Sequence, residues 1–174
     1  SRFSKYCNEF VCYPDPDEDE EGFVNFLIEY INKKQIQALL PMGDRVAEIA
    51  SKNKEKFKKV TNLLVPDFDV FMIARDKGIT LEYAKKHNVP YPKTYKIEDI
   101  ENDAEGIAYP VIIKPRISSA SMGIVIANSK EHVIECYKKV DAEYKDPIIQ
   151  EIIPDVGEHY QANLLFDENS EVKA

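Results

Sequence analysis

The segment from Tyr109 to Ile124 constrains the fold of this chain more than any other part of its sequence. It reads Tyr-Pro-Val-Ile-Ile-Lys-Pro-Arg-Ile-Ser-Ser-Ala-Ser-Met-Gly-Ile. The apolar run Val111–Ile113 predicts a buried strand that ends at Lys114, and a second apolar run, Gly123–Ala127, predicts another strand. A lysine at a strand end, followed by a loop of small residues rich in N–H and hydroxyl donors, is suited to holding phosphate oxygens.

The order of these parts distinguishes the loop from two common nucleotide-binding motifs. In a P-loop the lysine follows the glycines and begins a helix, whereas Lys114 precedes its loop and strands are predicted on both sides. The dinucleotide-binding pattern Gly-x-Gly-x-x-Gly does not occur in the chain. Strand, lysine, small-residue loop and strand is the order found in the ATP-grasp fold, and this segment resembles it.

Two further segments extend the resemblance along the chain. Phe68–Lys77, followed by a predicted helix and by Asn88–Thr94, resembles the family's Asp-Lys, helix, Gly/Asn-x-Pro-x-Pro segment. Pro147–Glu158 resembles its hinge strand. The nearest resemblance is to carbamoyl-phosphate-synthase-like ATP-grasp proteins, in which the loop often reads Lys-Pro-Arg followed by Gly, Ser or Ala. This chain departs from that pattern by keeping only Gly123, with serines and Ala120 where glycines are common.

The resemblance implies two phosphate-side lysines and a covering loop. Lys114 would contact the α-phosphate and the adenine edge of ATP, and Lys77 would be the earlier nucleotide lysine. The structural alternative is that both are ordinary lysines, one extending from a strand end and one on a helix surface. The covering loop would consist of small residues whose N–H groups approach oxygen closely, and a hairpin turn is compatible with that role. The loop residues are Ser119, Ala120, Ser121, Met122 and Gly123.

The resemblance also implies an adenine and ribose side. Glu151 would recognise the adenine amino group, Ile152 and Ile153 would present backbone groups to the adenine edge, and Glu158 would bind the ribose hydroxyls. The alternative for either glutamate is a solvent-facing side chain. His159, which follows Glu158, could face the pocket or the solvent.

The sequence does not decide the role of Arg116. Arg116 could approach phosphate or pair with a carboxylate, and the sequence leaves both open. No Ser/His/Asp or Cys/His set at a suitable spacing, and no carboxylate pair for acid–base chemistry, is evident in the sequence.

Composition narrows the class of protein and its partners. The 174 residues are 44% hydrophobic and 31% charged, as in globular proteins, and the net charge of −8 argues against a nucleic-acid or anionic-membrane surface. No apolar run approaches the roughly 18 residues of a membrane helix, so no membrane partner is expected. Three widely spaced cysteines, Cys7, Cys12 and Cys136, are expected to be free thiols, which favours a cytoplasmic protein.

Alternating strand and helix patterns predict an α/β fold. We expect a partial N-terminal βαβ lobe of the pre-ATP-grasp type over residues 1–66 and a helical linker over 67–94. The first α+β lobe of an ATP-grasp domain, which binds nucleotide and is incomplete at its C-terminus, would follow over 95–174. The predicted strands are 36–40, 60–65, 111–113, 123–127, 147–153 and 160–166. The predicted helices are 23–31, 45–52, 69–75, a segment from Asp76 or Thr80 to His87, and 129–144, with a helical or turn segment at 97–103.

We expect the chain to be part of a longer enzyme, because it begins without a start methionine and stops where a return strand would begin. The resemblance implies an ATP-dependent carboxylate–amine (or related) ligase that works through an acyl phosphate. Its carboxylate and amine substrates are not identified. The ligands for Mg²⁺ would lie outside this chain, so we expect no turnover from the chain alone. A non-catalytic α/β binding or assembly module is the alternative, and a phosphotransferase of different chemistry is a third hypothesis.

Overall fold

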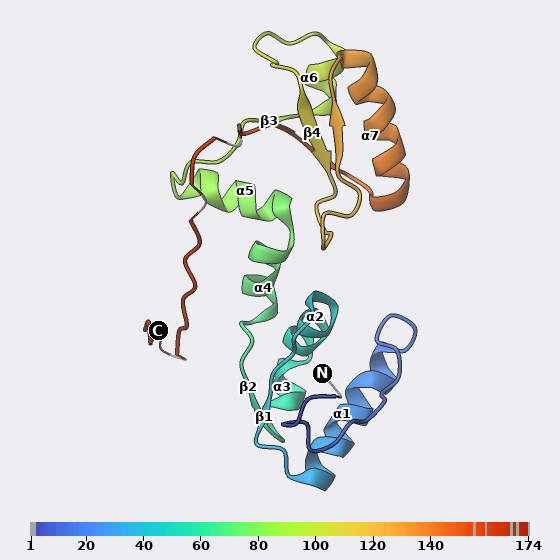
Figure 1. The fold of residues 1–174 in the computed structure, drawn as a ribbon, viewed down its shortest axis with the longest axis vertical. Coiled ribbons are helices and arrows are strands. Elements are labelled where there is room, and N and C mark those ends of the chain that lie inside the picture. Colours follow the sequence, from blue (N-terminus) through green and yellow to red (C-terminus); the bar gives the residue numbers. More distant parts are fainter. Residues whose placement is uncertain (1–2, 155, 159, 168, 170, 174) are drawn as a thin grey trace.

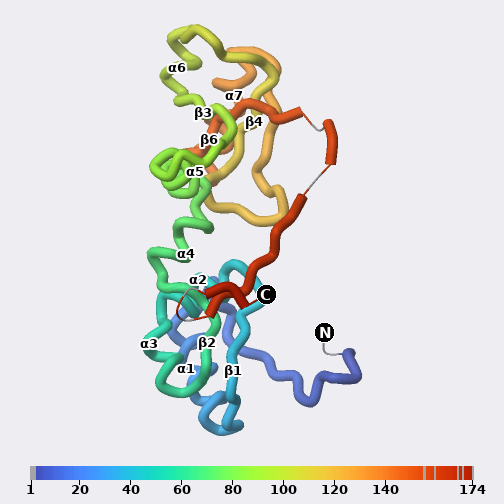
Figure 2. The backbone as a smooth tube through the Cα atoms, turned by 90° about the vertical axis from the view of Figure 1, so that its left-hand side faces the viewer, coloured from blue at the N-terminus to red at the C-terminus, as the bar shows by residue number. Residues whose placement is uncertain are grey.

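The computed structural model describes residues 3–154, 156–158, 160–167, 169 and 171–173. Two groups of buried residues form separate hydrophobic clusters, one in the N-terminal part and one around the sheet that follows. Figures 1 and 2 show these parts at opposite ends of an elongated molecule, with helices between them. The mixed α/β class predicted from the sequence is confirmed, whereas the division at residues 66 and 94 remains a prediction.

The N-terminal part packs helices against a short pair of parallel strands. Apolar residues at helical spacing place one face of α1 in the cluster, and Asp19 caps its first turn by accepting a hydrogen bond from the Gly22 N–H at 2.8 Å. The parallel pairing of the two strands confirms the βαβ expectation. The elements are α1 (Glu20–Lys34), β1 (Ala38–Leu39), α2 (Asp44–Lys52), α3 (Lys54–Phe57) and β2 (Asn62–Leu63).

Two consecutive helices connect this part to the sheet. Helix α4 (Phe68–Arg75) runs from one end of the molecule toward the other, and α5 (Lys77–Lys86) turns away from it (Figure 1). Asp76 separates them, because its side chain accepts hydrogen bonds from the N–H groups of Gly78 and Ile79 and so begins a new helix. Of the two predicted starts of this helix, the one at Asp76 is therefore confirmed.

The second part is an antiparallel four-stranded sheet with helices on one face. Its strand order is β3-β6-β4-β5, so that β4 lies between β5 and β6. Helix α7 begins after Ser129, whose hydroxyl accepts from the His132 N–H as the sequence predicted. The elements are β3 (Thr94–Tyr95), α6 (Ile97–Glu101), β4 (Val111–Lys114), β5 (Val125–Ala127), α7 (Lys130–Tyr144) and β6 (Ile148–Glu151).

The expected strand at residues 160–166 is wrong. In the described part of this segment, only Phe166 makes a strand-type bridge, to Val172, and the fourth strand of the sheet is β3 instead. Residues beyond β6 leave the sheet and run back toward the N-terminal part (Figure 2). Their apolar side chains, such as Tyr160 and Leu164, are exposed, because no neighbouring described strand pairs with them.

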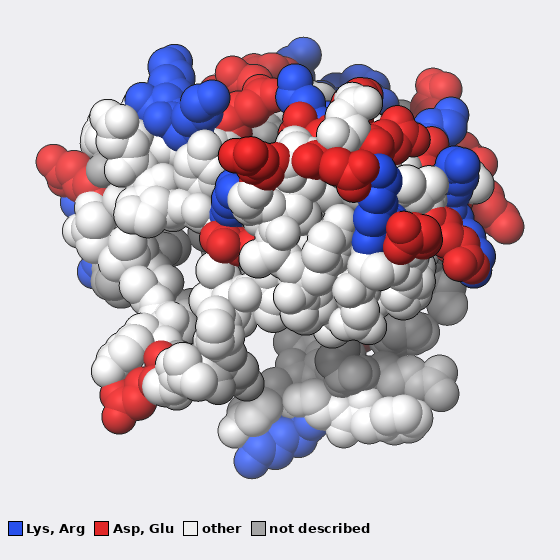
Figure 3. Space-filling model, turned by 90° about the horizontal axis from the view of Figure 1, so that it is seen from above, with Lys and Arg blue, Asp and Glu red and all other residues white. Residues whose placement is uncertain are grey.

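Charged side chains are mixed in sign over the sheet end of the molecule. Figure 3 shows acidic and basic residues interspersed on this face beside a broad area without charged side chains. Within the described residues, no helix is long and apolar enough to cross a membrane.

Candidate functional site

The carboxyl end of β4 meets the beginning of α5, and this junction brings the two predicted lysines together. The backbone N–H of Lys77 donates to the Arg116 carbonyl at 3.0 Å, which fixes the first turn of α5 beside the residues that follow Lys114. The Lys77 ammonium donates to the same carbonyl at 3.3 Å and to the Ser118 hydroxyl at 3.2 Å. One predicted lysine therefore touches the start of the predicted phosphate loop.

Both lysines are half-buried cations. Burial lowers the pKa of Lys77, and the nearby charge of Arg75 lowers it further. Burial also lowers the pKa of Lys114, with a further contribution from Lys77. Within the described residues, neither lysine forms an ion pair with a carboxylate. The two ammonium groups therefore repel each other in a partly desolvated place, and a bound anion would relieve that repulsion.

The loop between β4 and β5 is a tight turn with an unusual backbone. Ala120, Ser121 and Gly123 have φ values of 51°, 61° and 74°, and the Met122 N–H donates to the Ser119 carbonyl at 3.1 Å. Met122 is 56% exposed and lies at the exposed turn of this loop. A hairpin-like turn is present, and it remains compatible with a covering role over phosphates.

The Ser119 hydroxyl ties this loop to the N-terminal part of the chain. It donates a short hydrogen bond to the carboxylate of Asp44 at the start of α2. The side chain of Arg75 reaches the same place, with Nη1 3.4 Å from the Ser118 carbonyl oxygen and 3.7 Å from an Asp44 oxygen. Asp44 and Arg75 were not predicted as site residues from the sequence. Two signals could have indicated them: Asp44 follows the carboxyl end of the first strand, and Arg75 directly precedes the Asp-Lys pair.

Arg116, which the sequence left open, pairs with carboxylates. Its Nε lies 2.9 Å from Asp76 Oδ1, and its Nη1 lies 2.7 Å from Asp146 Oδ2. The hydrogen bonds that it donates to Asp76 and then to Asp146 raise its already high pKa. The guanidinium also covers Gly78, where an added Cβ would lie 2.6 Å from it. Arg116 thus holds β4, α5 and the end of α7 together.

The predicted adenine-side residues lie at the other end of the central strands. Lys114 pairs with Ile148, whereas Glu151 pairs with Val111, so three residues of register, about 10 Å, separate them along the sheet. Side chains alternate between faces, which places Glu151 on the face of Val111 rather than that of Lys114. Glu151 Oε1 accepts a hydrogen bond from the Lys93 N–H at 2.7 Å.

The remaining predicted residues lie beyond β6. Ile152 is partly buried and Ile153 is 59% exposed. Glu158 is exposed and accepts a short hydrogen bond from the Tyr160 hydroxyl. His159 lies outside the described residues. The structure therefore brings together the phosphate-side residues and leaves Glu158 on an extended segment.

No metal centre is apparent in the part of the chain that the structure describes. Among these residues, no group of three or more His, Cys, Asp or Glu side chains is placed to hold a metal ion. Asp44, the carboxylate nearest the loop, is engaged by Ser119 and lies near Arg75. The residues present at the site therefore fit an anion better than a cation.

Comparison with known proteins identifies the family. The family profile described as "ATP-grasp domain" matches residues 74–173, more than half of the chain. A D-alanine–D-alanine ligase of Fusobacterium nucleatum subsp. nucleatum is 34% identical over 97 residues, which cover 55% of this chain and 30% of that protein. A carbamoyl phosphate synthase large chain of Methanobrevibacter smithii is 27% identical over 113 residues, covering 62% of this chain and 11% of that protein.

Solved structures agree on the fold. A biotin carboxylase–β-γ-ATP complex from Campylobacter jejuni superposes with a TM-score of 0.65 at 16% identity, covering 79% of this chain and 34% of that chain. The chain thus spans between 11% and 34% of the length of each of these proteins. The matched residues contain both predicted lysines, the loop and the hinge strand, and the chain belongs to the ATP-grasp family.

Proposed function

We propose that this chain carries the nucleotide-binding part of an ATP-dependent carboxylate–amine (or related) ligase that works through an acyl-phosphate intermediate. The observation that carries the proposal is the convergence of Lys77 and Lys114 beside the loop. Two half-buried ammonium groups that form no ion pair with a carboxylate among the described residues favour an anionic ligand, and the loop adds hydroxyl and N–H donors to them.

The proposed ligand extends from the loop toward the hinge strand. The phosphates would lie between Lys77, Lys114 and the loop 119–123, whose N–H groups and serine hydroxyls add donors. The adenine would lie near Glu151, Ile152 and Ile153, and the ribose hydroxyls would be bound by Glu158. Along the sheet, about 10 Å separates Lys114 from Glu151, a length that suits a ligand with phosphates at one end and a base at the other, although the two side chains lie on opposite faces of the sheet.

ATP is the proposed nucleotide, and Mg²⁺ would accompany it as Mg-ATP. When bound, the metal would neutralise phosphate charge. We assign no ligand for it to this chain. The carboxylate and amine substrates remain unidentified, and the ligases among the relatives support only the general reaction class.

Mg-ATP is expected to raise the thermal unfolding midpoint of the chain, and Lys114→Ala is expected to abolish most of that rise. A ligand at about 100 times its dissociation constant adds about 2.7 kcal/mol to the free energy of unfolding. For a chain of this size, that corresponds to roughly 5–11 °C. Differential scanning fluorimetry with and without excess Mg-ATP measures the effect.

Lys139→Ala is the matched control for charge. Lys139 is an exposed lysine on α7, paired with Glu135, so its loss should leave the rise unchanged. If wild-type protein unfolds cooperatively but Mg-ATP does not move its midpoint, this chain does not form the proposed site, and the non-catalytic module becomes the better account.

We also expect nucleotide binding without turnover from these 174 residues. The chain spans 30% of the D-alanine–D-alanine ligase and 11% of the synthase large chain, so it aligns with only part of each enzyme. A coupled assay for ADP release with D-alanine and other amino acids tests this expectation, and turnover above the background of a Lys114→Ala sample would contradict it.

A further inference from the structure

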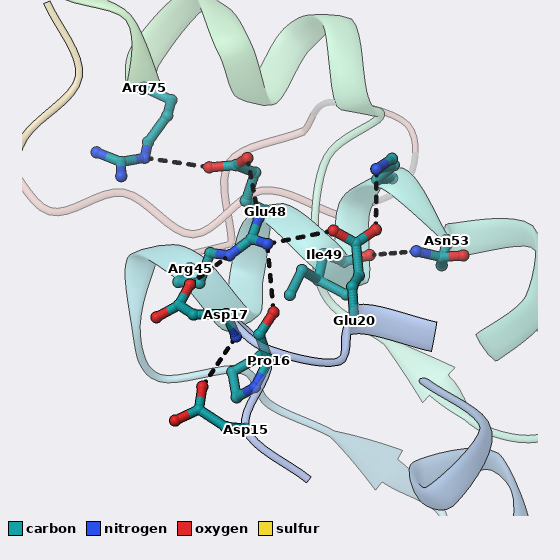
Figure 4. Close-up of polar contacts among 10 residues, drawn as sticks. Asp15, Pro16, Asp17, Glu20, Arg45, Glu48, Ile49, Asn53 and Arg75 are labelled. Atoms are coloured by element: carbon teal, nitrogen blue, oxygen red, sulfur yellow. Dashed lines mark hydrogen bonds and ion pairs between the residues drawn. The ribbon is translucent and has the colours of Figure 1, made fainter. Parts of the chain in front are cut away.

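Arg75 is a largely buried cation next to the proposed phosphate site. It is the last residue of α4, its side chain is only 14% exposed, and it extends toward α2 (Figure 4). No role for Arg75 was predicted from the sequence. The guanidinium carries five N–H donors, and a buried donor needs an acceptor.

Its described partners leave most of these donors unused. Nη1 makes one long hydrogen bond, 3.4 Å, to the Ser118 carbonyl. Nε is buried and has no hydrogen-bond partner among the described residues, and the nearest Glu48 oxygen is 3.6 Å away from it. A buried guanidinium with unsatisfied donors is costly unless another acceptor is present for part of the protein's working cycle.

The nearby carboxylates are shared with other groups. Glu48 also faces Arg45 Nη1 at 3.4 Å, and Asp44 also accepts the Ser119 hydroxyl. Figure 4 shows Glu48 between the two arginines. Arg116 provides a contrast, because it makes two close carboxylate contacts, of 2.9 and 2.7 Å, whereas both carboxylate contacts of Arg75 are longer than 3.5 Å.

Arg75 and Lys77 converge on Ser118, which directly precedes the loop 119–123. The Arg75 guanidinium contacts the Ser118 carbonyl, and the Lys77 ammonium contacts the Ser118 hydroxyl at 3.2 Å. A phosphate oxygen that reaches Lys77 at this place would also lie within reach of the guanidinium. The planar guanidinium of arginine can donate two parallel hydrogen bonds to two oxygens of one phosphate group.

We propose that Arg75 is a third phosphate-binding cation of this site, held ready by Asp44 and Glu48 and contacting the phosphates of the bound nucleotide together with Lys77. The inference rests on the proposed nucleotide-binding function. Its alternative is that Arg75 is only a structural link between α4 and α2.

Isothermal titration calorimetry with Mg-ATP and with adenosine separates the two accounts. Arg75→Met should weaken Mg-ATP binding by about tenfold or more, since hydrogen bonds to charged groups are lost. The affinity for adenosine, which carries no phosphate, should not change. Arg75→Lys should recover part of the loss, because it keeps the charge but not the planar guanidinium.

Arg45→Met is the matched control. Arg45 shares Glu48 with Arg75 and pairs with Asp17 at 2.9 Å, but makes no contact with the loop in the described structure. A structural role for Arg75 predicts that both methionine variants alter binding equally, or that Arg75→Met weakens adenosine and Mg-ATP alike, and either result would overturn the inference. Unchanged Mg-ATP affinity in Arg75→Met would overturn it as well. A wild type that fails to bind Mg-ATP would overturn the proposed function itself, and this inference with it.

Discussion

Replacing Asp76 by alanine is expected to lower the free energy of unfolding by about 2–4 kcal/mol. Asp76 is 8% exposed and makes two stabilising interactions: its carboxylate caps α5, and it pairs with Arg116 Nε at 2.9 Å. Loss of a helix cap costs about 0.5–2 kcal/mol, and loss of a hydrogen bond to a charged partner about 1.5–3 kcal/mol. Thermal unfolding should show a midpoint lower by roughly 4–16 °C.

Asp19→Ala provides the matched control for the cap alone. Asp19 caps α1 through the Gly22 N–H but is exposed and has no arginine partner in the described structure, so its loss should cost about 0.5–1 kcal/mol. Equal losses in the two variants would show that the pair with Arg116 contributes nothing to stability.

The pH dependence of unfolding gives a second measurement of the same contact. Burial alone would raise the pKa of Asp76, but hydrogen bonds from Arg116 and from the N–H groups of Gly78 and Ile79 outweigh it and lower the pKa below 3.8. A carboxyl with a depressed folded-state pKa stabilises the protein above its unfolded-state pKa, and this stabilisation is lost as the pH falls through the folded-state value. Wild-type stability should therefore fall more steeply below about pH 4 than that of Asp76→Asn.

The helices, and the place of Lys114 at the end of a strand, could be predicted from the sequence because their signals are local. The helix after Ser129 begins at a residue whose hydroxyl caps it, and its apolar positions repeat at helical spacing. Lys114 follows a short apolar run of β-branched residues between two prolines, a pattern that favours a buried strand. In both cases the residues that determine the helix or strand lie within it or within a few residues of its end.

The features that sequence reasoning missed depend on contacts between distant segments. Thr94–Tyr95 is too short to show a period, and it becomes a strand only because β6 pairs with it. Residues 160–166 are apolar enough for a strand but have no pairing partner among the neighbouring described strands. Arg75 lies 43 residues before Ser118, whose carbonyl it contacts, so no local pattern could place the two together.

Gly123→Ala is expected to destabilise the chain by about 2–4 kcal/mol and to weaken nucleotide binding. The residue has a φ of +74°, which costs a residue with a Cβ about 1–2 kcal/mol. The added Cβ would also lie 2.6 Å from Pro115 Cγ and 2.8 Å from Tyr144 Cε2, and such overpacking costs about 1–3 kcal/mol. Chemical denaturation measures the loss of stability, and calorimetry with Mg-ATP measures the loss of affinity.

Gly106→Ala separates backbone strain from crowding at Gly123. Gly106 has a φ of +79°, close to that of Gly123, but an added Cβ there would meet only the end of the Lys93 side chain, whose Nζ would lie 3.3 Å away. It should therefore lose only about 1–2 kcal/mol. Pro115 directly follows Lys114, so a movement of Pro115 that relieves the crowding at Gly123 would also displace the backbone beside Lys114. The affinity for Mg-ATP should therefore fall in Gly123→Ala and not in Gly106→Ala. If both variants lose the same stability and keep the same affinity, Gly123 serves only the turn, and the packing of Pro115 and Tyr144 does not position the site.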